Sequence, residues 1–175
     1  EQWENEIINS DELRLFIQGS VALMTASPSL ERAYQVLAQA SQRMEGFVND
    51  HDFVDLLRTM ELALVRGQVN PQLIGGFADR IGNEFPSENS LINRELIRLL
   101  AFLQVEQLDG RMLEFLANES VEANDKVHLA LHLHAAGERL EPALRLAMIA
   151  TLEEAIRNSR GAGNKLYVQK AVQIL

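Results

Sequence analysis

The chain has 175 residues, no cysteine, 6% aromatic residues and a net charge of −9. Without cysteine this segment has no disulfide, no thiolate zinc site and no cysteine nucleophile, and its negative charge disfavours binding to a phosphate backbone, so we expect no nucleic-acid partner. No apolar run reaches the roughly 18 to 20 residues that span a bilayer, so we expect no membrane insertion, and the many leucines and alanines favour helices packed on helices.

Apolar residues recur at three- and four-residue steps along the first half of the chain, which predicts an all-α fold. We expect the first ten residues to form a short helix or an entry strap, with Trp3 as a packing anchor. Capping residues and prolines mark the helix starts along the rest of this half. In chain order, these predicted starts are Asp11, Ser27-Pro28, Asp50 and Asn70-Pro71.

Two adjacent glycines, Gly75 and Gly76, lie in the interior of the fourth predicted helix. Each glycine costs about 1 kcal/mol relative to alanine at such a position, so another interaction should offset that cost. We favour close approach of a neighbouring helix backbone. The alternative is a ligand that rests against the bare backbone.

The loop from Asn83 to Ser90 is the best place for a sub-boundary in what we expect to be one domain, residues 1–175. Further helices are predicted on its C-terminal side, which brings the expected total to eight or nine. They cover Leu91–Leu103, a segment from about Asp109, Ala123–Ala136 with Gly137 as its cap, a segment from Pro142, and Leu166–Leu175. Because the last run ends without a capping residue, we expect a piece of a longer protein.

The helix pattern of Leu91–Leu103 returns in altered form as Glu122–His134, at an offset of 31 residues. Paired helices that recur at about 30 to 45 residues are typical of an α-solenoid, in which each unit packs only on its neighbours. The spacing is uneven, since Pro28 and Pro71 are 43 residues apart. We therefore predict an irregular HEAT-like solenoid, with an irregular helical bundle as the alternative fold.

Two histidines, His128 and His132, stand four residues apart on one predicted helix, the spacing that helical zinc sites use. The glutamate that would act as general base in a metalloprotease helix is missing, and no third ligand is fixed by the sequence. We therefore interpret both histidines as polar positions on the exposed shoulder of a repeat helix.

A polar ridge formed by Asn93, Arg94 and Arg98 lies beside the leucine stripe of the fifth long helix. It indicates either a protein-binding surface or surface ion pairs such as Glu95 with Arg98. We take these three residues, together with His128 and His132, as the candidate protein-binding set. We assign no catalytic, cofactor-binding or metal-binding residue and expect no enzyme activity.

The runs Ile92–Gln104 and Lys126–Leu133 resemble the helical repeat region of large multidomain bacterial proteins of the planctomycete type. Those proteins resemble exported dehydrogenases, with a sorbosone-dehydrogenase-like propeller before the repeats and a c-type cytochrome domain after them. The resemblance covers about half the chain, and its motifs are degenerate. The glycine-glycine turn and Ser-Phe of that group are replaced here by the stretch 160–167.

This resemblance implies a linker or docking scaffold in an extracytoplasmic, periplasmic redox protein, with haem and substrate sites on other domains. None of the family's catalytic residues corresponds to a position in this segment, and composition alone leaves the compartment open. We therefore predict a non-catalytic helical repeat scaffold that binds a protein or neighbouring domains. The alternative is a helical metal-binding or enzymatic domain that uses His128 and His132.

Overall fold

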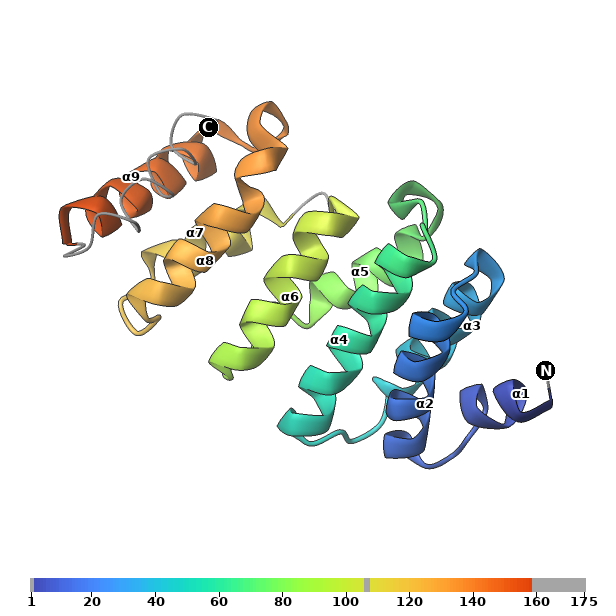
Figure 1. Ribbon diagram of the computed structural model, residues 1–175. Helices are drawn as coiled ribbons and strands as arrows, with labels where there is room; N and C mark the ends of the chain where they lie inside the picture. The colour runs from blue at the N-terminus through green and yellow to red at the C-terminus, as the bar shows by residue number, and fades with distance from the viewer. Residues whose placement is uncertain (1, 106–107, 159–175) are drawn as a thin grey trace. The chain divides into compact units, whose positions relative to one another are not determined.

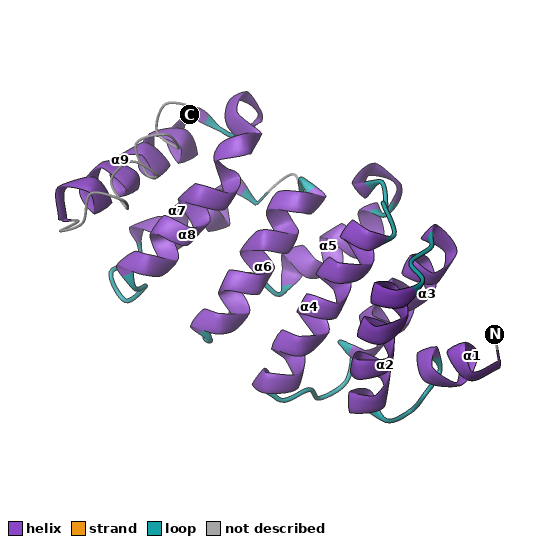
Figure 2. Ribbon diagram, in the orientation of Figure 1, coloured by secondary structure: helices purple, strands orange, loops and turns teal. Residues whose placement is uncertain are grey.

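The computed structural model describes residues 2–105 and 108–158, and in these ranges the chain forms nine α-helices and two short 3-10 helices with no strand (Figure 1, Figure 2). The predicted all-α class is confirmed. The α-helices are α1 Gln2–Ile8, α2 Leu13–Ala26, α3 Leu30–Arg43, α4 Asp50–Arg66, α5 Gly75–Asn83, α6 Ser90–Leu103, α7 Asp109–Ala117, α8 Ala123–Leu133 and α9 Pro142–Asn158. The 3-10 helices are η1 Pro71–Leu73 and η2 His134–Arg139. The predicted helix Leu166–Leu175 lies outside the described residues.

The chain divides into two compact units, residues 1–80 and 81–175, and each is described by itself. In the first unit, α2 and α3 both pack against α4, and α1 lies on α2. Helix α1 is held by Ile8, which is 3% exposed, and by Ile7, whose side chain lies directly over Gly19. Trp3 is 57% exposed, so the expectation that it anchors the segment is wrong.

Asparagine and serine side chains determine where several helices begin. The Ser29 hydroxyl accepts a hydrogen bond from the backbone N–H of Arg32, and Asn49 caps α4 through the N–H of Asp52. The predicted starts at Ser27-Pro28 and Asp50 are therefore displaced by one or two residues. Asn70 does cap the segment after it, but that segment is η1 and not the fourth long helix, which begins only at Gly75.

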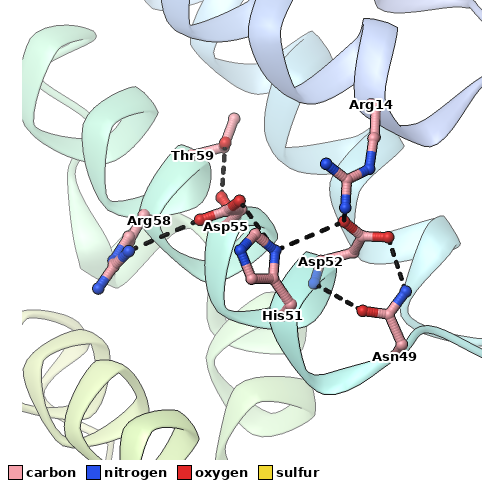
Figure 3. A network of polar contacts seen from close by, with 7 residues as sticks. All are labelled: Arg14, Asn49, His51, Asp52, Asp55, Arg58 and Thr59. Atoms are coloured by element: carbon pink, nitrogen blue, oxygen red, sulfur yellow. Dashed lines mark hydrogen bonds and ion pairs between the residues drawn. The ribbon is translucent and has the colours of Figure 1, made fainter.

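A polar network joins the start of α4 to α2 (Figure 3). The Arg14 guanidinium lies 2.8 Å from Asp52 Oδ1, while Asn49 Nδ2 donates to Asp52 Oδ2 at 2.7 Å. His51 Nδ1 lies 3.5 Å from Asp55 Oδ2. The Asp52 side chain is 13% exposed and is therefore mostly buried at this contact. Its carboxylate lies in the first turn of α4, where the positive end of the helix dipole stabilises a negative charge. The network therefore stabilises the contact between α2 and α4.

The predicted close approach of a neighbouring helix is wrong at Gly76. Gly75 begins α5, so the pair lies at a helix start, and a methyl group added at Gly76 would meet nothing within 4 Å. Close packing occurs instead at Gly67, just past the end of α4. A methyl group there would collide with Ala33 of α3 and come within 2.7 Å of the Ala63 carbonyl oxygen.

In the second unit, α8 lies between α6 and α9, and α7 packs on α9 (Figure 1). Helix α8 ends at Leu133 and the chain tightens into η2, so the predicted end at Ala136 is too late. Pro142 begins α9 as predicted. The core of the unit consists mainly of aliphatic side chains with Phe85 and Phe115, whose ring centroids are 5.2 Å apart. None of the described helices has the length and apolar character needed to cross a membrane.

Candidate protein-binding surface

One face of α6 carries a row of partly exposed side chains, Leu91, Arg94, Arg98 and Phe102, which we call the α6 ridge. Their spacings of three, four and four residues place them on one side of a helix with 3.6 residues per turn. Leu91 is 55% exposed and Phe102 is 37% exposed, and the Arg94 and Arg98 side chains are 36% and 35% exposed. The ridge thus presents apolar groups at both ends and two arginines between them.

Arg94 is held by a carboxylate from the neighbouring helix α8. Its Nε donates to Asp125 Oδ1 at 2.7 Å, and the Ser90 hydroxyl donates to Asp125 Oδ2 at 2.6 Å. The Asp125 side chain is 4% exposed, and a carboxylate buried to that extent is tolerated only with such partners. Both oxygens of Asp125 are therefore used to join α8 to α6.

The two histidines lie beside this ion pair. His128 Nε2 is 3.1 Å from the backbone carbonyl of Arg94, and because a carbonyl can only accept, this nitrogen carries the proton. The His128 and His132 rings are 4.3 Å apart. Burial, followed by the nearby His128 and Arg98, lowers the pKa of His132 to about 4, and burial also lowers the pKa of His128. Both rings are neutral at pH 7.

The other two candidates behave differently from each other. Arg98 forms the ion pair with Glu95 that was the alternative interpretation of the ridge, although the Glu95 side chain is buried and not at the surface. Asn93 is buried and does not belong to the ridge: its side chain accepts from the Ser87 N–H at 2.7 Å and donates to the Ser87 carbonyl at 2.8 Å. Asn93 comes two residues after Leu91, which is about 200° around the helix, so it faces the loop that precedes α6.

This geometry gives little support to metal chemistry at the histidine pair. Within residues 2–105 and 108–158, no group of three or more His, Asp or Glu side chains is placed to hold a metal ion. Asp125, the carboxylate that acts electrostatically on His128, is bonded through both oxygens, and His128 Nε2 is directed at a carbonyl. The polar atoms of this cluster serve mainly to fix α6 on α8.

Sequence reasoning missed Ser90 and Asp125, the two residues that complete the cluster. A signal for Asp125 was present, because the offset of 31 residues that superimposes the two helix patterns places Arg94 on Asp125. Equivalent positions of adjacent repeats often lie side by side when the repeats stack. The charge complementarity of the two positions therefore pointed to this contact.

Comparisons with protein-family models, with curated proteins and with solved structures each gave no significant match. The resemblance to planctomycete-type repeat regions therefore stays a prediction.

Proposed function

We propose that this chain is a non-catalytic helical scaffold that binds a protein partner, or a neighbouring domain of its parent protein, through the α6 ridge. One observation supports this more than any other. Leu91 and Phe102 stay exposed at the ends of the ridge, while the carboxylate and imidazole groups near Arg94 are committed to holding that part of α6 in place. Such a surface is better suited to binding a partner than to catalysis.

The residue types on the ridge suit a binding interface. Burial of a leucine or phenylalanine side chain contributes about 1.5 to 3 kcal/mol when the side chain is fully covered, so partial cover of Leu91 and Phe102 contributes less than that each. Arginine and aromatic residues are enriched among the residues that dominate binding energy. Asp125 engages Arg94 only through Nε, so among the described residues the two terminal nitrogens of Arg94 remain to donate to a partner's carbonyl or carboxylate.

The ridge is also held in place before any partner binds. The Asp125 and Ser90 bonds fix the Arg94 side chain, and the His128 bond fixes its backbone. A partner therefore loses less free energy to ordering this surface than it would on a mobile one. From Leu91 to Phe102 the ridge is about 16 Å long, which matches a partner helix of about three turns. A strip of this length buries less area than the ~800 Å² per partner of a standard interface. We therefore expect weak binding at this surface alone.

The repeat interpretation is part of the proposal. The contact between Arg94 and Asp125, positions that superimpose at the 31-residue offset, supports α6 and α8 as adjacent HEAT-like units. A place in an extracytoplasmic redox protein rests on the sequence resemblance alone. The parent sequence tests it: a signal peptide upstream and a Cys-x-x-Cys-His motif downstream are expected, and their joint absence removes that part of the proposal.

The alternative function, a metal-binding or enzymatic domain built on His128 and His132, is favoured only by the 4.3 Å separation of the two rings. Ordinary packing of neighbouring helix positions one turn apart produces the same contact.

Site-specific photo-crosslinking in cells that express the parent protein tests the proposed surface. A photoreactive phenylalanine at Leu91 or Phe102 is expected to form one discrete adduct, with a partner or with another domain of the same chain. The matched control carries the same group at Leu146, which is 67% exposed on α9 of the same unit. The Arg94→Glu change should abolish the adducts from the ridge. Equal, diffuse adduct patterns at Leu91, Phe102 and Leu146 would contradict the proposal.

A further inference from the structure

The first unit contains a pocket between α3 and the η1–α5 segment. Its volume is about 280 Å³, the liquid volume of roughly nine water molecules. Leu37, Leu73 and Phe77 supply apolar walls, and Tyr34, Ser41 and Arg80 bring polar groups. The pocket shares no residue with the α6 ridge, so a ligand bound in it is independent of the proposed function.

The Ser41 side chain is buried and faces this pocket. Ser41 is 8% exposed and lines the pocket wall. The helical hydroxyls of Thr25 and Thr59 donate to the carbonyl four residues earlier, but the Ser41 hydroxyl makes no hydrogen bond to another residue in the described part of the chain. The hydroxyl is therefore available to bond a ligand oxygen in the pocket.

Gly76 is one of the residues that line the pocket. It lies in the first turn of α5, where a methyl group would meet nothing within 4 Å, so no neighbouring residue requires a glycine there. A larger side chain at this position therefore has room to extend, which makes Gly76 the place to test whether the pocket can be filled.

Arg80 provides a cation at the same place. Its Nη1 donates to the Ser41 carbonyl at 3.4 Å and to Glu45 Oε1 at 3.0 Å. Within residues 2–105 and 108–158 these bonds use one of its three nitrogens, Nη1, which leaves the Nε and Nη2 edge to bind a carboxylate in a bidentate fork. The Glu45 side chain is mostly exposed at the rim, so it can share the guanidinium with a second carboxylate or move away from it.

We propose that this pocket binds a small monocarboxylate with a compact apolar body. The carboxylate bonds Arg80 and the Ser41 hydroxyl, and the apolar body lies against Leu37 and Phe77. A single anionic head matches the single cation of the pocket. The volume lies just below the range of about 300 to 1,000 Å³ for drug-sized ligand sites, so it limits the body to a short aliphatic chain or one ring.

Hexanoate is the probe for this proposal, with hexan-1-ol as the uncharged control, and amide chemical shifts of the whole chain are the readout. Hexanoate should bind with a Kd on the order of 0.1 to 1 mM, and shifts should change in residues 34–41 and 73–80. Hexan-1-ol should bind at least about tenfold more weakly, because it lacks the charge-assisted bonds to Arg80. No binding of hexanoate at millimolar concentration, or equal binding of the alcohol, would overturn the proposal.

Four variants separate the contributions. Gly76→Leu should fill the pocket and abolish binding, while Gly110→Leu places the same side chain on α7, where a methyl group also meets nothing within 4 Å, and should leave binding unchanged. Arg80→Gln should weaken binding at least about tenfold. Glu45→Gln should strengthen binding, since it removes the competing carboxylate. If Gly76→Leu fails to fold, Arg80→Gln and Glu45→Gln still test the proposal. Weaker binding in both variants would indicate that Arg80 acts only through Glu45, and it would overturn the proposal.

A carboxylate attached to a compact apolar group occurs both in a free acid and at the C-terminus of a peptide that ends in an apolar residue. A second titration therefore compares hexanoate with a short peptide ending in leucine, with its C-terminus as the carboxylate or as the amide. Tighter binding of the peptide carboxylate than of hexanoate would assign the pocket to a peptide terminus, and the reverse order to a free acid. Equal binding of the peptide amide and the peptide carboxylate would overturn the role of the carboxylate.

Discussion

Two groups of arginines, one from each unit, bond to different acceptors. In the first unit, Arg66 of α4 donates to the carbonyls of Met24 and Thr25 at the end of α2, and Arg43 donates to the Ser10 carbonyl at 2.6 Å. On the α6 ridge of the second unit, Arg94 and Arg98 pair with side-chain carboxylates and stay partly exposed. Guanidinium groups that satisfy the last carbonyls of a helix stabilise the fold, whereas those held by carboxylates at a surface can still contact a partner.

The largest expected effect tests the buried side of the ridge. Asp125→Ala leaves the Ser90 hydroxyl and the Arg94 guanidinium without their shared acceptor, which should lower the free energy of unfolding by about 2 kcal/mol. Urea unfolding measures the loss, and hydrogen exchange should locate it in α6 and α8. Glu122→Gln is the control, an exposed acidic residue at the start of α8 with no capping bond. Equal effects of the two changes would show that the Asp125 contacts contribute nothing specific.

The carbonyl-bonding arginines of the first unit should matter less individually. Arg66→Gln removes the Nη2 bond to Thr25, 3.0 Å long, and the weaker Nε bond to Met24 at 3.3 Å. The carbonyls can be rehydrated because the site is partly exposed, so the expected loss is about 1 kcal/mol. The loss should appear as faster hydrogen exchange in α2 and α4. A loss larger than that of Asp125→Ala would reverse the comparison between the units.

The dependence of stability on pH should depend on His132 of the second unit. His132 has a pKa of about 4 in the folded chain, because of burial and then of His128 and Arg98, and an ordinary value of 6.5 when unfolded. Between these values the unfolded chain binds more protons, so this residue's contribution to stability is complete above about pH 6.5 and is lost as the pH falls towards 4. Since the His132 side chain is only partly buried, solvent screening limits the loss to at most ~1 kcal/mol.

Thermal melts between pH 4 and 7 measure this effect. His132→Gln, which cannot be protonated, should melt with a shallower dependence on pH than the parent chain. Carboxylates titrate in the same range in both proteins, so only the difference between their slopes reports on His132. Parallel pH curves would show that the ring is solvated in the folded chain as it is in the unfolded one.

Local sequence signals predicted the helical class and the approximate positions of several helix starts, because the apolar periodicity and the capping side chains act within a few residues. Pro142 and Asn70 mark starts where they were expected, although Asn70 opens a 3-10 turn. Packing was not predictable in this way. The sequence does not show which glycine is closely packed: Gly67 is pressed against Ala33, whereas Gly76 borders open space. That difference depends on which helix lies opposite, and the sequence does not specify the partner of each face.

The same limit applies to the candidate surface. Arg94, Arg98 and the two histidines were identified from their spacing on single helices, and they do lie in or beside one cluster. Asn93 was misassigned, since its bonds to Ser87 cross a loop that the helical period does not describe. Ser90 and Asp125 become partners only when α6 packs on α8.

The smallest expected effect concerns metal, and it decides between the two functions considered for the histidine pair. His128 Nε2 faces the Arg94 carbonyl, which leaves Nδ1 as its only nitrogen for a metal, and both oxygens of Asp125 are bonded to α6. Two imidazoles without a third protein ligand bind Zn²⁺ weakly, because structural and catalytic sites use three or four ligands. A chelator should therefore leave the melting temperature unchanged, and added Zn²⁺ should raise it no more in the parent chain than in His128→Gln. A rise in the parent chain alone would show that the histidine pair binds metal. The two units would then differ in a metal site and not only in the acceptors that their arginines bond.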